Sequence, residues 1–85
     1  MDLRTVFASN VRRLRSERGF SQCELAAEAE LDRSYLSRLE NARNNATLEL
    51  VAKIADVLGV EPAELLTPTG SNRHRMVAPR VTPKY

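Results

Sequence analysis

Two helix-capping motifs lie close together in the middle of this chain, at Ser21 and Asp32. The letters SQCE, which begin at Ser21, fit the S-x-x-E capping box that satisfies free N–H groups at a helix start. Asp32 is a good N-cap for a second helix. The spacing therefore predicts two short helices, over about 22–29 and 33–41, joined by a tight turn. Because this turn holds no glycine, we expect a residue with positive φ there, with Glu30 the best candidate.

Apolar residues recur every three or four positions through the rest of the first 66 residues, which is the period of amphipathic helices. No strand pattern or internal repeat is evident, so we expect an all-α fold with five helices. The three further helices are expected at 2–18, ended by Gly19; at 48–58, capped by Thr47 and ended by Gly59; and at 62–66, with Pro62 in the first turn. The residues expected to face the core include Leu25, Ala26, Ala29, Leu36, Leu39, Leu50, Val51, Ile54, Ala55 and Leu58.

The apolar pattern stops at Thr67, which predicts a folded domain over 1–66 and a flexible tail over 67–85. The folded part holds nine basic and eleven acidic residues, a net charge of −2, whereas the tail holds four basic residues and no acid. The folded domain is therefore not broadly basic, and any contact with a polyanion must come from a local cluster.

Composition argues against several classes of site. Cys23 is the only cysteine, which excludes an intramolecular disulfide, and we expect it to be a half-buried filler on its helix. The only histidine, His74, lies in the tail, so metal binding and catalysis are not expected. No apolar run approaches the ~20 residues that span a bilayer, and no apolar signal segment begins the chain. We expect a cytoplasmic protein that is not an enzyme and has no cofactor, metal, small-molecule ligand or membrane partner.

The predicted helix over 33–41 has one apolar face and one polar face. Leu36 and Leu39 are expected to point inward, and the residues on the opposite face are Arg33, Ser34, Ser37 and Arg38. Arginine can form two parallel bonds to the O6 and N7 atoms of guanine, and serine can bond either kind of base edge. The alternative is that these residues are ordinary solvated surface groups. The capped two-helix context favours base contact from the start of this helix.

Residues on either side of this helix are candidates for phosphate contacts. Gln22 lies at the start of a helix, where free N–H groups and the helix dipole favour anions. Tyr35 lies on the flank of the predicted helix over 33–41, where it can cover the edge of the core. The loop that follows supplies a second set, Arg43, Asn44 and Asn45 with the cap Thr47. Two anchors of this kind would fix the angle at which a helix enters a groove.

The segments RSERGFSQCELAAEAELDRSYLSRLEN and IADVLGVEPAELL resemble the Cro/C1-type (XRE-type) helix-turn-helix family of prokaryotic and phage repressors, over residues 4–66. The stretch LDRSYLS is especially similar to restriction–modification controller proteins, which are small dimeric activator-repressors. The resemblance implies a five-helix lambda-repressor-like domain that binds an operator as a dimer. The family often has glycine where this chain has Glu30 and Ala42.

The resemblance also implies roles for single residues. Gln22 falls where the family holds a phosphate and braces the recognition helix. Tyr35 falls where contact with the DNA backbone or a thymine methyl is common. Arg15 and Glu40 match a family pair that ties the first helix to the end of the third. The base-reading positions of the family coincide with Arg33, Ser34 and Arg38.

These observations predict a homodimeric transcriptional regulator that binds a pseudo-palindromic site in double-stranded DNA, with the helix over 33–41 in the major groove. Val57 and Leu65 are candidates for the dimer surface, because their positions are less committed to the core than those of Ile54, Leu58 and Leu66. The alternatives are an antitoxin-like or adaptor module whose main partner is a protein, and non-specific binding through the tail. The tail itself can follow the DNA backbone, enter a minor groove, or be a solvated end.

Overall fold

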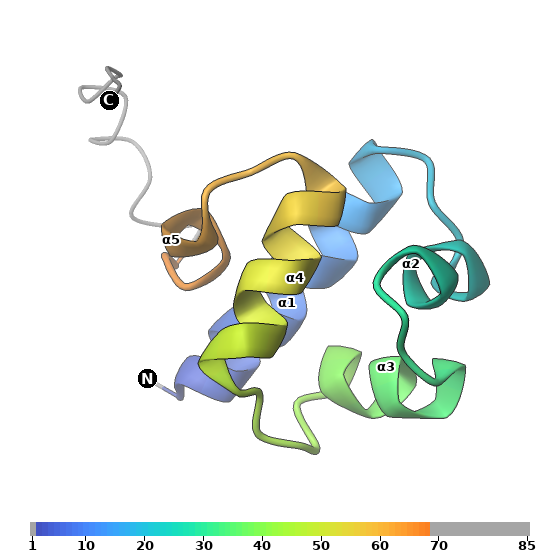
Figure 1. Ribbon diagram of the computed structural model, residues 1–85. Coiled ribbons are helices and arrows are strands. Elements are labelled where there is room, and N and C mark those ends of the chain that lie inside the picture. The colour runs from blue at the N-terminus through green and yellow to red at the C-terminus, as the bar shows by residue number, and fades with distance from the viewer. Residues whose placement is uncertain (1, 69–85) are drawn as a thin grey trace.

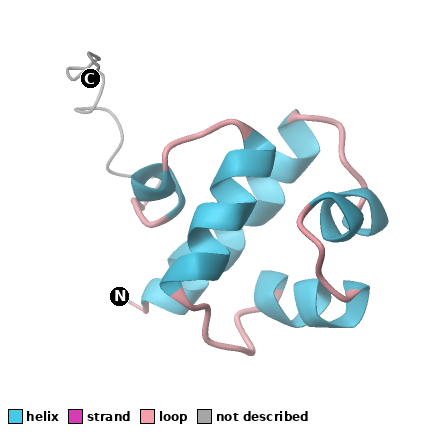
Figure 2. Ribbon diagram, in the orientation of Figure 1, coloured by secondary structure: helices cyan, strands magenta, loops and turns pink. Residues whose placement is uncertain are grey.

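The computed structural model describes residues 2–68, so the tail predicted over 67–85 lies outside the described residues from residue 69 onward. The described part contains helices and no strands (Figure 2). Each predicted helix boundary lies within one residue of the observed one. The helices are α1 (Leu3–Glu17), α2 (Gln22–Glu28), α3 (Arg33–Glu40), α4 (Leu48–Leu58) and α5 (Pro62–Leu65).

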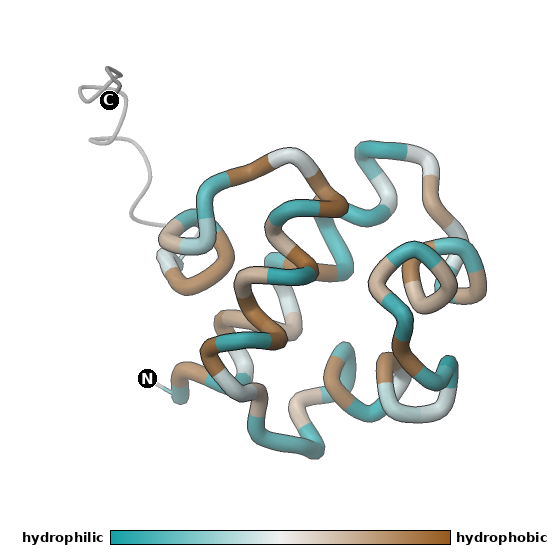
Figure 3. The backbone as a smooth tube through the Cα atoms, viewed as in Figure 1, coloured by the Kyte–Doolittle hydropathy of each residue, from teal (hydrophilic) through white to brown (hydrophobic). Residues whose placement is uncertain are grey.

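The longer helices α1 and α4 pack against each other and form the centre of the domain (Figure 1). The pair formed by α2 and α3 lies to one side of them, and α5 lies to the other side, against α1 and α4. Apolar and polar positions alternate along α1 and α4 with the helical period (Figure 3). None of the helices within residues 2–68 is long and apolar enough to cross a membrane.

The core is made of aliphatic side chains with one aromatic residue. All ten predicted core residues of α2, α3 and α4 and the turn after α2 are buried, which confirms the inward face of each helix. From α1 the core receives Phe7, Val11 and Leu14, whereas Leu3 is 54% exposed. Burial of apolar side chains contributes about 25 cal/mol per Å². Each of these buried apolar side chains therefore contributes to the stability of the domain's single core.

Three helices begin at the predicted capping residues, and α1 begins after Asp2, a cap that was not predicted. Ser21 and Glu24 form the full capping box: the Ser21 hydroxyl accepts from Glu24 N–H at 3.0 Å, and the Glu24 carboxylate accepts from Ser21 N–H at 2.8 Å. Asp32 and Thr47 cap α3 and α4. Asp2 caps α1 by accepting the backbone N–H of Arg4, and this hydrogen bond lowers the pKa of the Asp2 carboxyl below its usual value. Local hydrogen bonds thus explain where these helices begin.

The short helix α5 is held to α1 by a buried asparagine. The Asn10 side-chain amide is 1% exposed and donates to the carbonyl of Leu65 at 2.9 Å and to that of Thr67 at 2.9 Å. This clamp satisfies carbonyls at the end of α5 that would otherwise lack partners. It also places Leu65 in the core with no exposed surface. The prediction that Leu65 is less committed to the core than Leu66 and available for a dimer surface was therefore wrong, whereas Val57 is partly exposed.

The environment of the single cysteine also differs from the expectation. Cys23 lies on α2 and is exposed, rather than half-buried. The inward positions of α2 are instead occupied by Leu25 and Ala26. The buried face of such a short helix is narrow, and it does not reach the second residue of α2.

Candidate nucleic-acid interface

The turn between α2 and α3 fixes the angle between these helices without a glycine. Glu30 has φ of 59°, which confirms the expected positive φ at this residue. The N–H of Leu31 donates to Ala26 carbonyl at 2.7 Å, and the N–H of Glu30 donates to Ala27 carbonyl at 3.2 Å. These two bonds form a Schellman motif, which satisfies free carbonyls at the end of α2. The chain then passes to Asp32, and α3 begins directly after it.

The two faces of α3 have the predicted polarity. Leu36 and Leu39 are 0% and 1% exposed and pack into the core. Arg33, Ser34 and Arg38 are exposed, whereas Ser37 is partly buried. The exposed residues therefore include both arginines, which are free to meet a ligand outside the domain. A helix held by one leucine face and exposing arginine and serine on the other can enter a major groove.

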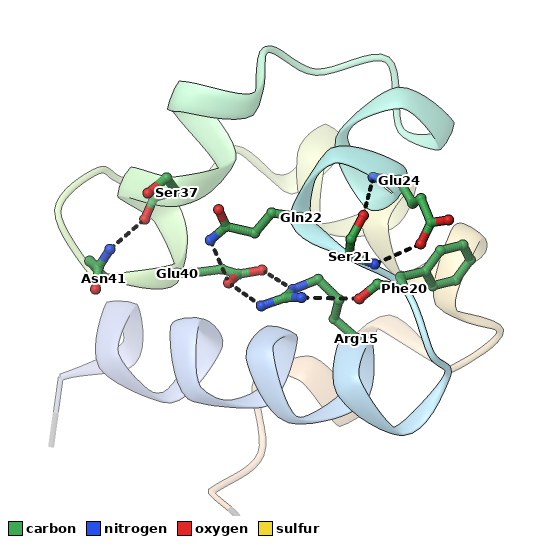
Figure 4. Close-up of polar contacts among 8 residues, drawn as sticks. All are labelled: Arg15, Phe20, Ser21, Gln22, Glu24, Ser37, Glu40 and Asn41. Carbon is green, nitrogen blue, oxygen red and sulfur yellow. Dashed lines mark hydrogen bonds and ion pairs between the residues drawn. The ribbon is translucent and has the colours of Figure 1, made fainter.

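A buried carboxylate fixes the C-terminal end of α3 (Figure 4). Glu40 is 1% exposed and accepts two bonds from the Arg15 guanidinium of α1, from Nε at 2.7 Å and from a terminal nitrogen at 3.0 Å. Gln22, at the start of α2, donates its side-chain amide to the same carboxylate at 3.0 Å. The remaining terminal nitrogen of Arg15 donates to Phe20 carbonyl at 3.0 Å. Side chains from three helices therefore meet at one carboxylate, which confirms the predicted pair of Arg15 and Glu40.

A polar hollow lies at the exposed end of α3. It is lined by Ser37, Arg38, Asn41 and Arg43, so the structure brings two predicted base contacts next to one predicted phosphate contact. Asn41 was not predicted. Its side-chain amide donates to Ser37 carbonyl at 2.8 Å (Figure 4). The spacing of four residues between Ser37 and Asn41 places both on one helix face, and this signal was available in the sequence.

A second hollow lies on the flank of α3, between this helix and α4. Its lining includes the two predicted contacts Tyr35 and Thr47, together with Glu49 and Lys53 of α4. Lys53 was not predicted, because its position beside Tyr35 depends on how α4 packs. The Thr47 hydroxyl accepts from Leu50 N–H at 3.0 Å and still has its own O–H to donate. Tyr35 is partly buried and packs against the core. Its ring therefore covers the edge of the core and leaves one side exposed to the hollow.

The loop after α3 carries the remaining candidates. Arg43 and Asn45 are exposed, and Asn44 is partly buried. The loop begins at Ala42, whose φ of 59° repeats the geometry found at Glu30. The two positions at which the resembled family often has glycine therefore adopt the left-handed conformation without it, at a cost in backbone strain. The loop after α3 lies beside the exposed face of this helix.

Comparison with known proteins identifies the domain. The helix-turn-helix family model matches residues 11–65. Control protein C.BamHI of Bacillus amyloliquefaciens is 39% identical over 66 residues, which are 76% of this chain and 82% of that protein.

Two solved structures extend the comparison. A hypothetical transcription factor from Neisseria is 43% identical, with a TM-score of 0.82 over 88% of this chain and 85% of that one. The biofilm regulator SinR, solved in complex with DNA, is 34% identical, with a TM-score of 0.68 over 72% of this chain and 98% of that one. The chain belongs to the Cro/C1-type helix-turn-helix family, whose members include transcriptional regulators and restriction–modification control proteins.

Proposed function

We propose that this protein is a homodimeric transcriptional regulator that binds a pseudo-palindromic DNA site, with α3 in the major groove of each half-site. The observation that carries the proposal is the exposed pair Arg33 and Arg38 on a helix whose opposite face is buried. Two copies related by a two-fold axis would read half-sites about 34 Å apart, which is one turn of DNA. Such a regulator acts in the compartment that holds its DNA, here the cytoplasm.

The candidate contacts divide into two groups. Base edges would be read by Arg33, Ser34, Ser37 and Arg38, because these residues form the outward part of α3. Phosphates would be held on both sides of α3, by Gln22 at the start of α2 and by a second group made of Tyr35, Arg43, Asn45 and Thr47. The bond from Gln22 to Glu40 supports this division, since it links the start of α2 to the end of α3. A phosphate held at Gln22 would thereby fix the depth of α3 in the groove.

Selection of bound sequences from a random pool of duplex DNA tests the proposal. We expect the purified protein to enrich one pseudo-palindrome whose half-sites are centred about 10 base pairs apart. Recovery of unrelated sequences would contradict sequence-specific binding. Enrichment that required an added protein partner would favour the adaptor alternative instead.

Replacing Arg43 with alanine is expected to weaken binding by a similar factor on every DNA sequence. A phosphate contact carries no base information, and its loss lowers the salt slope of binding by about 1. Fluorescence anisotropy titrations over a range of salt concentrations measure this slope. Arg12→Ala is the matched control, because Arg12 is exposed on α1 and is not among the candidate contacts. Equal slopes for wild type and Arg43→Ala would remove Arg43 from the phosphate contacts.

We propose an apolar groove beside the loop after α3 as the surface that a second copy covers. Leu3 is 54% exposed and Leu48 is 83% exposed, and both line this groove together with Leu66. Leu3 and Leu48 are the exposed large apolar side chains of residues 2–68. Asn44 and Asn45 form part of the same wall, so the groove adjoins the proposed DNA-binding face.

Replacing Leu48 with glutamate is expected to shift the protein from dimer to monomer, since the new carboxylate would lose its hydration at the interface and replace an apolar contact. Analytical ultracentrifugation over a range of concentrations measures this shift. Ala52→Glu introduces the same charge one turn further along α4, at an exposed position outside the groove, and should leave the dimer unchanged. A Leu48→Glu protein that dimerises as well as wild type would exclude the groove as the interface.

A further inference from the structure

The guanidinium of Arg38 is held from two sides by neighbouring side chains. Its central carbon lies 5.9 Å from the centre of the Tyr35 ring, within the range of a cation–π contact. The Asn44 side chain lies on the loop after α3. With its amide oriented so that both polar atoms find partners, its oxygen accepts from Arg38 Nε at 3.2 Å. Its nitrogen then donates to Arg43 carbonyl at 3.0 Å, which fixes the amide on the loop backbone.

These contacts use the part of Arg38 that guanine does not need. The ring and the amide engage the carbon centre and Nε, whereas the two terminal nitrogens form no hydrogen bond or ion pair within residues 2–68. A pair of N–H groups on an arginine can bond guanine O6 and N7 together. An arginine that is already oriented loses less conformational entropy on binding than one that moves freely.

We propose that Asn44 is a positioning residue that, together with the Tyr35 ring, pre-orients Arg38 to read a guanine in each half-site. This proposal rests on the proposed function, because it requires that α3 enters the major groove. This positioning role replaces the phosphate contact that the sequence predicted for Asn44. Its bond to Arg43 carbonyl also links the base-reading arginine to the loop that would hold a phosphate.

The test measures discrimination at a single base pair. The guanine assigned to Arg38 is first identified as the position where Arg38→Ala loses base preference in selected sites. Affinities are then measured for the selected site and for a site with that guanine replaced in both half-sites. Ordering one long side chain corresponds to about 2- to 12-fold in affinity. We expect Asn44→Ala to reduce the discrimination between the two sites by about this factor, and to leave affinity for the substituted site unchanged.

Asn44→Asp separates positioning from phosphate contact. An aspartate keeps an oxygen that can accept from Arg38 Nε but loses the N–H that donates to Arg43 carbonyl, so discrimination should lie between those of wild type and Asn44→Ala. If Asn44 held a phosphate, Asn44→Ala would weaken both sites equally, and the negative charge of Asn44→Asp would weaken them more; that result overturns the proposal. In an Arg38→Ala background, Asn44→Ala should have no further effect on discrimination, and an undiminished effect there also overturns it.

The failure of this inference can be told from failure of the proposed function. If Arg38→Ala leaves every base preference unchanged, then Arg38 does not read a base and both proposals for this residue fall. If Arg38→Ala relaxes one position while Asn44→Ala changes nothing at that position, only the positioning role of Asn44 falls. Thermal unfolding of each variant followed by circular dichroism establishes that the compared proteins are folded.

Discussion

Replacing Glu40 with alanine is expected to destabilise the domain by about 3–5 kcal/mol, because it leaves the Arg15 guanidinium without its carboxylate. Glu40 is 1% exposed, and the Arg15 side chain is 18% exposed. Small domains have only about 5–15 kcal/mol of total stability, so this loss is a large share of it. Urea unfolding followed by circular dichroism measures the change. A Glu40→Ala protein within about 1 kcal/mol of wild type would contradict the structural role of the pair.

Two further variants show whether the loss of stability in Glu40→Ala comes from the unpaired charge of Arg15. Glu17→Ala removes an exposed carboxylate that lies 3.6 Å from Arg13, and an exposed pair of this kind contributes no more than about 0.5 kcal/mol. The double variant Arg15→Met with Glu40→Leu removes both charges and fills the space with apolar atoms. It should recover most of the stability lost in Glu40→Ala, because buried pairs replaced by apolar residues are often neutral. A double variant as unstable as Glu40→Ala would point to lost packing instead.

Replacing Arg33 with alanine is expected to cost about 1–3 kcal/mol in binding to the selected site and to relax base preference at one position of each half-site. The expected cause is loss of two parallel hydrogen bonds to a guanine, which phosphate contacts cannot replace. Competition titrations with sites that differ at one base pair measure both effects. The Arg12→Ala variant serves again as the control for the loss of one exposed positive charge.

The pattern of loss distinguishes base reading from general attraction to DNA. If Arg33 only attracts phosphates, its removal will weaken all sites by one factor and lower the salt slope, as expected for Arg43→Ala. If Arg33 is a solvated surface charge, neither affinity nor preference will change. Only a loss that depends on the base at one position supports the proposed role.

The local part of the fold was predictable from the sequence because local interactions determine it. The capping box at Ser21 and the caps at Asp32 and Thr47 involve residues two or three positions apart, so the start of each helix could be read directly. The positive φ of Glu30 followed from a tight turn that lacks glycine. The inward face of each helix followed from the helical period. The pair of Arg15 and Glu40 was implied by the family resemblance, and its geometry confirms it.

The incorrect and missing predictions involve residues far apart in the sequence. The burial of Leu65 depends on the clamp from Asn10, more than fifty residues earlier. Nothing in the helical pattern of α1 distinguishes a buried asparagine from an exposed one. Lys53 was missed for the same reason, since its place beside Tyr35 depends on the packing of α4 against α3. Such contacts follow from tertiary packing, which the period of a single helix does not encode.

The groove and the positioning of Arg38 show the same limit. Leu3 and Leu48 belong to different helices, and only the fold brings them to one surface. Leu3 follows the apolar period of its helix, yet the fold leaves it 54% exposed. The contact between Asn44 and Arg38 likewise depends on the course of the loop after Ala42, whose positive φ turns the chain back toward α3.

Methylation interference on the selected site tests most directly whether side chains of α3 meet bases in the major groove. Dimethyl sulfate methylates guanine N7 in the major groove and adenine N3 in the minor groove. The proposed binding mode predicts that methylated guanines in both half-sites block wild-type protein, and that Arg33→Ala and Arg38→Ala each become insensitive at one guanine per half-site. Interference confined to adenine N3, or a pattern unchanged in both arginine variants, would contradict it.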